Sequence, residues 1–150
     1  MSMGTSGSQD RRAVDIALLA VRVVVGVIFA AHGAQKLFGA FGGPGLAAVV
    51  EMMGPLGYPV TVGEFFGGLG LVVGFLCRFS AASLIVIMLG AIGMVHGKNG
   101  FLGPTGFEYN LALIGLLVPT LVAGPGRFAI GRFLPLPKSG QTGRPIVALE

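Results

Sequence analysis

The chain has 150 residues, of which 53% are apolar and only 11% are charged, and its mean hydropathy is +0.86. Soluble domains carry about 25% charged residues, so this composition excludes an ordinary soluble fold and indicates an integral membrane protein. The net charge of +4 does not indicate a nucleic-acid partner, because the basic residues form no basic face and no patch interleaved with aromatic side chains. The lone cysteine, Cys77, has no partner for a disulfide or a CxxC motif and is expected to be a small buried apolar side chain.

Four apolar stretches predict an all-α fold, an integral membrane four-helix bundle. The first, residues 13–38, exceeds the 7–15 apolar residues of a cleaved signal peptide, so we expect a retained helix. The other three are near the lower length limit for crossing a bilayer and cover residues 60–77, 79–96 and 107–123. Arg78 alone separates the second stretch from the third, which predicts a tight helical hairpin.

The segments around these helices have the composition of surface structure. Residues 45–53 predict a short helix on the outer surface, and the Gly and Pro residues that follow would end it. Residues 1–12 and 135–150 are polar or rich in glycine, and we predict disordered or flexible tails on either side of a single domain over residues 13–134.

The positions of Lys and Arg predict how the bundle is oriented. With four crossings, the N-terminus, the connection between the second and third helices and the C-terminus share one side of the membrane. Only Lys36 and Lys98 lie on the other side. The positive-inside rule then predicts that both termini lie in the cytoplasm. The basic residues on the predicted inner side are Arg11, Arg12, Arg78, Arg127, Arg132, Lys138 and Arg144.

Ionisable residues gather at the predicted outer ends of the helices. A charge in hydrocarbon costs roughly 2.5–3.5 kcal/mol on insertion scales, so such groups are expected to face the bundle interior, where they find partners. Arg22 lies deeper in the first helix, where we expect it to snorkel to the inner headgroups or to be buried and paired. The residues of the predicted cluster are His32, Lys36, Glu64, His96, Glu108, Tyr109 and Asn110.

The cluster allows three interpretations. It can be a structural ion-pair network, with Lys36 paired to Glu64 or Glu108 and the histidines as hydrogen-bond partners. It can be a pocket for a small molecule such as a quinone headgroup, in which Lys36 and His32 polarise a carbonyl or anion, the glutamates accept protons and His96 completes a relay. It can also be a metal or haem site, with His32, Glu64, His96 and Glu108 as the possible metal ligands, although no HxxxH, ExxH or CxxCH spacing supports one.

Small residues recur along the second predicted helix at Gly63, Gly67, Gly70 and Gly74. This spacing is typical of close contact between two membrane helices. The contact can lie within the chain or form the seam of a homodimer.

Three motifs occur together in this chain: HGAQKLFG from His32, GEFFGGLGLVVG from Gly63, and FEYN from Phe107. Together with MVHGKNGF and GPGR they resemble the DoxX family, over about residues 14–133. Many members of that family follow the Gly-Pro-Gly with a Ser-Leu-Asp type of sequence, where this chain has Phe-Ala-Ile-Gly at 128–131.

The resemblance implies a four-helix protein of the bacterial inner membrane with a link to redox processes. Relatives are described as membrane subunits of a thiosulfate:quinone oxidoreductase. Others are described as parts of a complex with superoxide dismutase and a thiosulfate sulfurtransferase in oxidative-stress defence. Our leading hypothesis is therefore a membrane subunit in quinone or thiol redox chemistry, with the polar cluster as its site. The alternative is a non-catalytic scaffold that recruits redox partners.

Overall fold

A computed structural model describes residues 6–132, which fold as helices joined by short turns and loops and contain no strand. The all-α fold is therefore confirmed. Residues 1–5 and the predicted C-terminal tail, 135–150, lie outside the described residues. The α-helices are α1 (Ser6–Phe38), α2 (Gly45–Met53), α3 (Gly57–Val73), α4 (Cys77–Ala91) and α5 (Glu108–Ala123).

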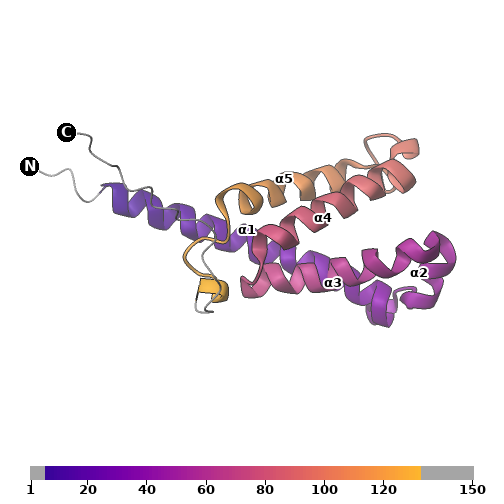
Figure 1. Cartoon of the computed structure of the whole chain (residues 1–150). Coiled ribbons are helices and arrows are strands. Elements are labelled where there is room, and N and C mark those ends of the chain that lie inside the picture. Colours follow the sequence, from indigo (N-terminus) through magenta and orange to yellow (C-terminus); the bar gives the residue numbers. More distant parts are fainter. Residues whose placement is uncertain (1–5, 133–150) are drawn as a thin grey trace, which may run out of the picture.

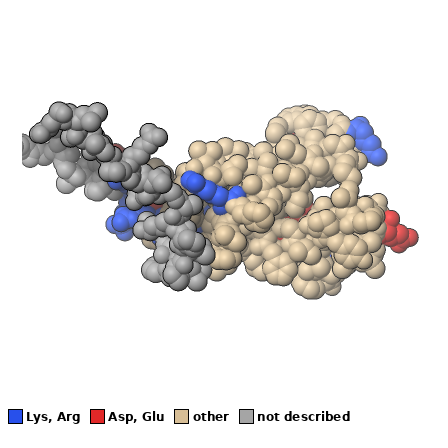
Figure 2. Space-filling model, in the orientation of Figure 1, with Lys and Arg blue, Asp and Glu red and all other residues tan. Residues whose placement is uncertain are grey.

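The helices have the lengths and hydropathy of a membrane bundle. Three helical stretches are long and apolar enough to cross a bilayer: Gln9–Phe38, Ala40–Val73 and Cys77–Asn99. The fourth, α5, is apolar and shorter, at 16 residues. Figure 2 shows uncharged side chains over the middle of the molecule and charged ones toward its two ends. The predicted integral membrane four-helix bundle is confirmed, with α2 as the short additional helix.

The four long helices pack as two pairs, α1 with α3 and α4 with α5. The most extensive contact is between α1 and α3, α4 packs on α5, and α3 joins the two pairs through α4. Figure 1 shows the pairs diverging toward the end that carries α2. We call this the α2 end, and we call the opposite end, where α3 turns into α4, the hairpin end.

Several predicted helix boundaries were wrong. Helix α1 already includes Ser6, the first residue that the structure describes, and does not start at Ala13, because no proline interrupts residues 6–12 and adding a turn to a formed helix costs little. Residues 6–12 are therefore helical and not a disordered tail. Helix α3 ends at Val73, since Gly74 takes up φ +82° and donates its N–H to the Gly70 carbonyl, at 3.0 Å. The hairpin turn is thus 74–76, and Arg78 lies inside α4.

The contact between α1 and α3 depends on glycine. A Cβ atom on Gly33 would lie 2.4 Å from the Phe65 nitrogen, and one on Gly68 would lie 2.4 Å from the Ala30 nitrogen. These distances mean that the two backbones touch, as in other membrane helix pairs built on small residues. The close approach brings the last turn of α1 beside the second turn of α3, which positions the site described below.

The glycine stripe on α3 makes its contact within the chain. Added Cβ atoms on Gly63, Gly67 and Gly70 would meet side chains of α4, and Gly74 ends the helix. The apolar core lies between the two ends of the bundle and receives residues from all four long helices. Its central members include Val25, Phe29, Leu71, Leu84 and Leu117.

Candidate functional site

An ion pair between α1 and α3 is the centre of the predicted polar cluster. The Lys36 Nζ atom lies 2.6 Å from Oε1 and 2.7 Å from Oε2 of Glu64. Glu64 is 2% exposed, whereas 30% of the Lys36 side chain is exposed. Of the two partners that the sequence allowed for Lys36, the structure therefore selects Glu64.

The pair borders a cavity of about 390 Å³ between the two helix pairs, which we call the polar cavity. Figure 2 shows the molecule hollowed between the α2–α3 and α4–α5 parts at the α2 end. The cavity brings together six of the seven predicted cluster residues from α1, α3, the end of α4 and the start of α5. These are His32, Lys36, Glu64, His96, Tyr109 and Asn110.

Both histidines are oriented by backbone carbonyl groups. The Nδ1 atom of His32 lies 2.9 Å from the Ile28 oxygen, and that of His96 lies 2.9 Å from the Thr105 oxygen. A carbonyl can only accept a hydrogen bond, so Nδ1 carries the proton in both rings. In a neutral imidazole, Nε2 then keeps its lone pair and can accept a proton from a ligand in the cavity.

His96 reaches the cavity through an irregular end of α4. From Ile92 to His96 the helix widens into a π-helical turn. Such turns change the register of the side chains that follow and are frequent at functional sites. Asn99 supports this arrangement, because its Nδ2 atom donates to the same Thr105 carbonyl at 3.2 Å.

Two further residues complete the polar lining on α5. The Tyr109 ring lies beside the His32 ring, with 6.3 Å between the ring centroids. Asn110 is buried and donates to the Met88 sulfur at 3.4 Å. Tyr109 thus lies toward the opening of the cavity, where it is 48% exposed, and Asn110 lies at its boundary with the apolar core.

The prediction for Glu108 was wrong. This residue is exposed, does not line the polar cavity, and accepts a hydrogen bond from the Gly103 N–H at 3.4 Å. As the first residue of α5 it lies beside unpaired N–H groups, where a carboxylate is stable without entering the bundle. In the part of the chain that the structure describes, no three His, Cys, Asp or Glu side chains could hold a metal ion together. The four-residue metal site is therefore not formed.

Arg22 is buried far from this cluster. It is 1% exposed, and its Nη1 and Nη2 atoms donate to the carbonyls of Pro125 and Phe128 at 2.9 and 2.7 Å. The side chain thus does not snorkel, and its partners are backbone groups of the segment after α5. That segment is folded back onto the hairpin end.

Thr61 is a buried polar residue that the sequence analysis did not single out, and it does not line the polar cavity. This residue is 0% exposed, and its hydroxyl has no hydrogen-bond partner among the described residues. It lies three residues before Glu64 and so on the same face of α3. In the sequence, the available signal for its position was its spacing of three residues from Glu64.

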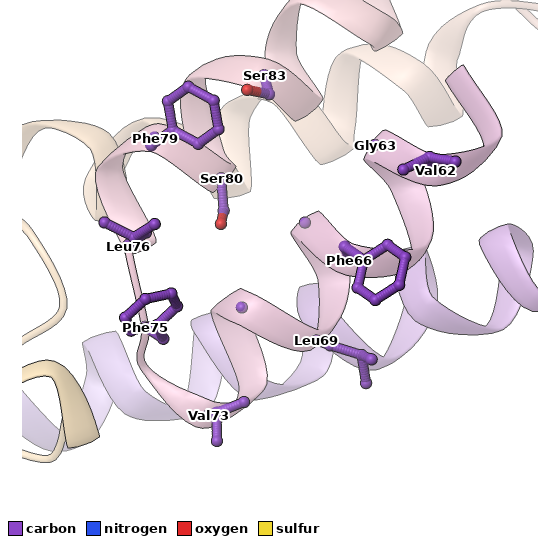
Figure 3. Close-up of a pocket in the computed structure, with 12 residues that line it drawn as sticks. Val62, Gly63, Phe66, Leu69, Val73, Phe75, Leu76, Phe79, Ser80 and Ser83 are labelled. Atoms are coloured by element: carbon purple, nitrogen blue, oxygen red, sulfur yellow. The ribbon is translucent and has the colours of Figure 1, made fainter. Parts of the chain in front are cut away.

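A second hollow lies between α3 and α4 toward the hairpin end and has a volume of about 470 Å³. Figure 3 shows its walls of Phe66, Phe75 and Phe79, with the hydroxyls of Ser80 and Ser83 on α4. No titratable side chain lines it. It therefore differs in chemistry from the polar cavity.

Comparisons with known proteins agree with the membrane architecture. The family model described as DoxX matches residues 17–97. The chain is 30% identical to "Putative oxidoreductase CatD" of Bacillus subtilis (strain 168) over 68% of this chain and 76% of that protein. It is 29% identical to "Inner membrane protein YqjF" of Escherichia coli (strain K12) over 80% of this chain and 93% of that protein. No solved structure matches significantly.

Proposed function

We propose, since this chain belongs to the DoxX family, that it is a membrane subunit of a redox system and that its polar cavity binds the headgroup of a quinone. The observation that carries the proposal is the convergence of one ammonium group, one carboxylate and two imidazoles on a single cavity. Its volume, about 390 Å³, is within the range of small-molecule pockets.

The charge balance of the cavity favours a neutral ligand over an anion. Because Glu64 lies against Lys36, their charges cancel. The carbonyl contacts occupy Nδ1 of both histidines and leave Nε2 available to a ligand. A quinone is neutral and has two carbonyl oxygens that accept hydrogen bonds, so it fits this set of groups.

The same groups suit the protons of quinone chemistry. Reduction of a quinone to a quinol consumes two electrons and two protons, one on each oxygen. Lys36 and a protonated histidine can donate to these oxygens, and a neutral Nε2 can accept a proton when the quinol is oxidised. The electrons are exchanged with a partner protein of the redox system.

The second candidate function is a scaffold that recruits redox partners without binding a quinone. It is favoured by the Lys36–Glu64 pair itself, since the ammonium already contacts both carboxylate oxygens. In this case the cluster serves only to hold α1 against α3.

We further propose that both termini face the cytoplasm, which places the polar cavity near the periplasmic headgroups. The excess of Lys and Arg toward the hairpin end and the chain termini supports this orientation.

A binding titration distinguishes the two functions. Purified protein in detergent is titrated with ubiquinone-1 and with menadione, and the variants Lys36→Ala and Glu64→Gln are compared with Glu108→Gln. Glu108→Gln is the matched control, because it removes the same charge outside the cavity. We expect at least tenfold weaker binding for the first two variants and unchanged binding for the control.

Equal quinone affinity in the wild type, Lys36→Ala and Glu64→Gln would rule the site out. Thermal unfolding in the same detergent gives the second readout. The scaffold function would be supported if the wild type bound no quinone and the variants Lys36→Ala and Glu64→Gln lost stability. The Lys36–Glu64 pair would then contribute to folding and not to ligand binding.

A further inference from the structure

A third cavity, of about 450 Å³, adjoins the polar cavity and extends between α3 and α4 beneath α2. We call it the tail groove. The two cavities share four lining residues, of which Lys36, Glu64 and His96 are titratable and the fourth is Ala91. The Lys36–Glu64 pair and His96 therefore form a common wall between the polar cavity and the tail groove.

The rest of the tail groove is apolar. Apart from Lys36, Glu64 and His96, no titratable side chain lines it. Methionines are prominent in its walls, and their flexible side chains adapt to irregular apolar ligands. Lining residues from α2, the segment after it, α3 and α4 include Met52, Met53, Leu56, Val60, Val86 and Met94.

The tail groove is open at the surface. Met52, Val86 and Met94 are between 58% and 75% exposed. In a chain whose helices cross a membrane, an apolar surface at this position faces lipid. A molecule dissolved in the bilayer can thus reach the Lys36–Glu64 pair sideways, without passing through water.

We infer that the ligand of this protein is an amphiphile with a linear apolar tail, which enters from the lipid, places its polar head in the polar cavity and leaves its tail in the tail groove. The inference rests on the proposed function and adds the ligand class and the route of entry. An isoprenoid quinone has this form, with a neutral head and a flexible hydrocarbon chain.

The hollow in Figure 3 shows why the shared wall matters. It has a similar volume and an apolar lining, but it has no titratable residue at either end. It can accommodate hydrocarbon, but its polar side chains are only the uncharged hydroxyls of Ser80 and Ser83, and no ion pair or imidazole lines it to bind a polar head.

Gly90 on α4 provides a way to block the tail groove without disturbing the fold. It lines the groove, and a Cβ atom added there would meet nothing within 4 Å. Gly115 on α5 has equally open surroundings and lines neither cavity. Gly90→Leu and Gly115→Leu are therefore a matched pair, and Val86→Trp is a second way to fill the groove.

The test compares ubiquinone-2, which has a tail of two isoprene units, with ubiquinone-0, which has the same head and no tail. We expect the wild type to bind ubiquinone-2 at least tenfold more tightly than ubiquinone-0. Gly90→Leu and Val86→Trp should lose that advantage and bind ubiquinone-0 within twofold of the wild type. Gly115→Leu should leave both affinities unchanged.

Each other outcome contradicts a defined part of the scheme. Equal affinities of the wild type for the two quinones, or full binding of ubiquinone-2 by both groove variants, would overturn the tail groove and leave the headgroup site standing. No binding of either quinone by the wild type would overturn the proposed function, and the tail groove with it.

Discussion

Of the four cationic residues in helix α1, Arg22 and Lys36 lie within the bundle, and their surroundings differ. Arg22 is 1% exposed, its guanidinium is held by two backbone carbonyls, and it lines neither the polar cavity nor the tail groove. Lys36 keeps 30% of its side chain exposed, contacts one carboxylate and lines both cavities. The two residues are about four helical turns apart, so they occupy opposite ends of the bundle.

The comparison shows that a charge within a membrane helix does not by itself indicate a binding site. Arg22 is the more deeply buried of the two, and its contacts join α1 to the segment after α5. The planar guanidinium suits this role, because it donates in two fixed directions. Lys36 is distinguished by the open volume beside it. We base the proposed site on buried charge together with open volume, a combination that Lys36 and Glu64 have and Arg22 lacks.

The largest expected effect is that of Arg22→Ala. The variant removes two charge-assisted hydrogen bonds, each worth about 1.5–3 kcal/mol, and leaves a cavity in their place. We expect a loss of about 3–6 kcal/mol in the free energy of unfolding, measured in detergent by thermal or denaturant unfolding. Quinone affinity of the remaining folded protein should be unchanged.

Arg22→Lys is the control for charge. Lysine keeps the cation but cannot donate in the two directions of a guanidinium, so it should recover only part of the stability. The distinction between Arg22 and Lys36 would fail if Arg22→Ala were as stable as the wild type. It would also fail if folded Arg22→Ala protein lost quinone binding.

Lys36→Met should have the next largest effect. It leaves the Glu64 carboxylate buried without a partner, and breaking a buried pair in this way typically costs about 3–5 kcal/mol. Because Lys36 is partly exposed, we expect about 3 kcal/mol, at the lower end of that range. The double variant Lys36→Met, Glu64→Gln should recover most of this loss, since no charge is then left buried.

Quinone binding distinguishes a Lys36–Glu64 pair that belongs to a binding site from a pair that only stabilises the fold. The double variant should be close to the wild type in stability and still fail to bind a quinone. A double variant that binds normally would show that the pair contributes only to folding.

Much of this fold follows from composition and spacing. The apolar stretches and turn residues predict four helices and the short helix over 45–53, and the alternating direction of the helices brings His32, Lys36, Glu64 and His96 to one depth. Helix ends were less predictable. A helix continues until a specific local feature stops it, so α3 ends before Gly74 for a reason that hydropathy does not contain.

The site was predictable as a set of residues but not as a geometry. Glu108 and Glu64 are both glutamates at the same predicted end of the bundle. Only the three-dimensional packing shows that Glu108 faces the loop before α5, whereas Glu64 faces the bundle interior. The partners of Arg22 and of both histidines are backbone carbonyls. Sequence patterns of side chains do not reveal such partners, and neither cavity could be inferred before the helices were packed.

The smallest expected effect concerns a second attachment of the segment after α5. Asp15 Oδ1 accepts a hydrogen bond from the Arg127 backbone N–H at 3.0 Å, and the Arg127 Nε atom lies 4.0 Å from Oδ2. Asp15→Ala removes the acceptor of the backbone bond, so we expect a loss of about 1 kcal/mol. Arg127→Ala keeps that bond and removes only a distant, 72% exposed partner, so the loss should be below about 0.5 kcal/mol.

Unfolding measurements on the two single variants and on each combined with Arg22→Ala show whether one residue fixes this segment. If Arg22 is the main attachment, Asp15→Ala should cost clearly more in the wild type than in the Arg22→Ala background, where the segment is already loosened. An Arg127→Ala loss as large as that of Asp15→Ala would mean that the exposed ion pair, and not the backbone hydrogen bond, holds the segment. An Asp15→Ala loss larger than that of Arg22→Ala would assign the attachment to Asp15 and leave the buried guanidinium without the structural role that separates it from Lys36.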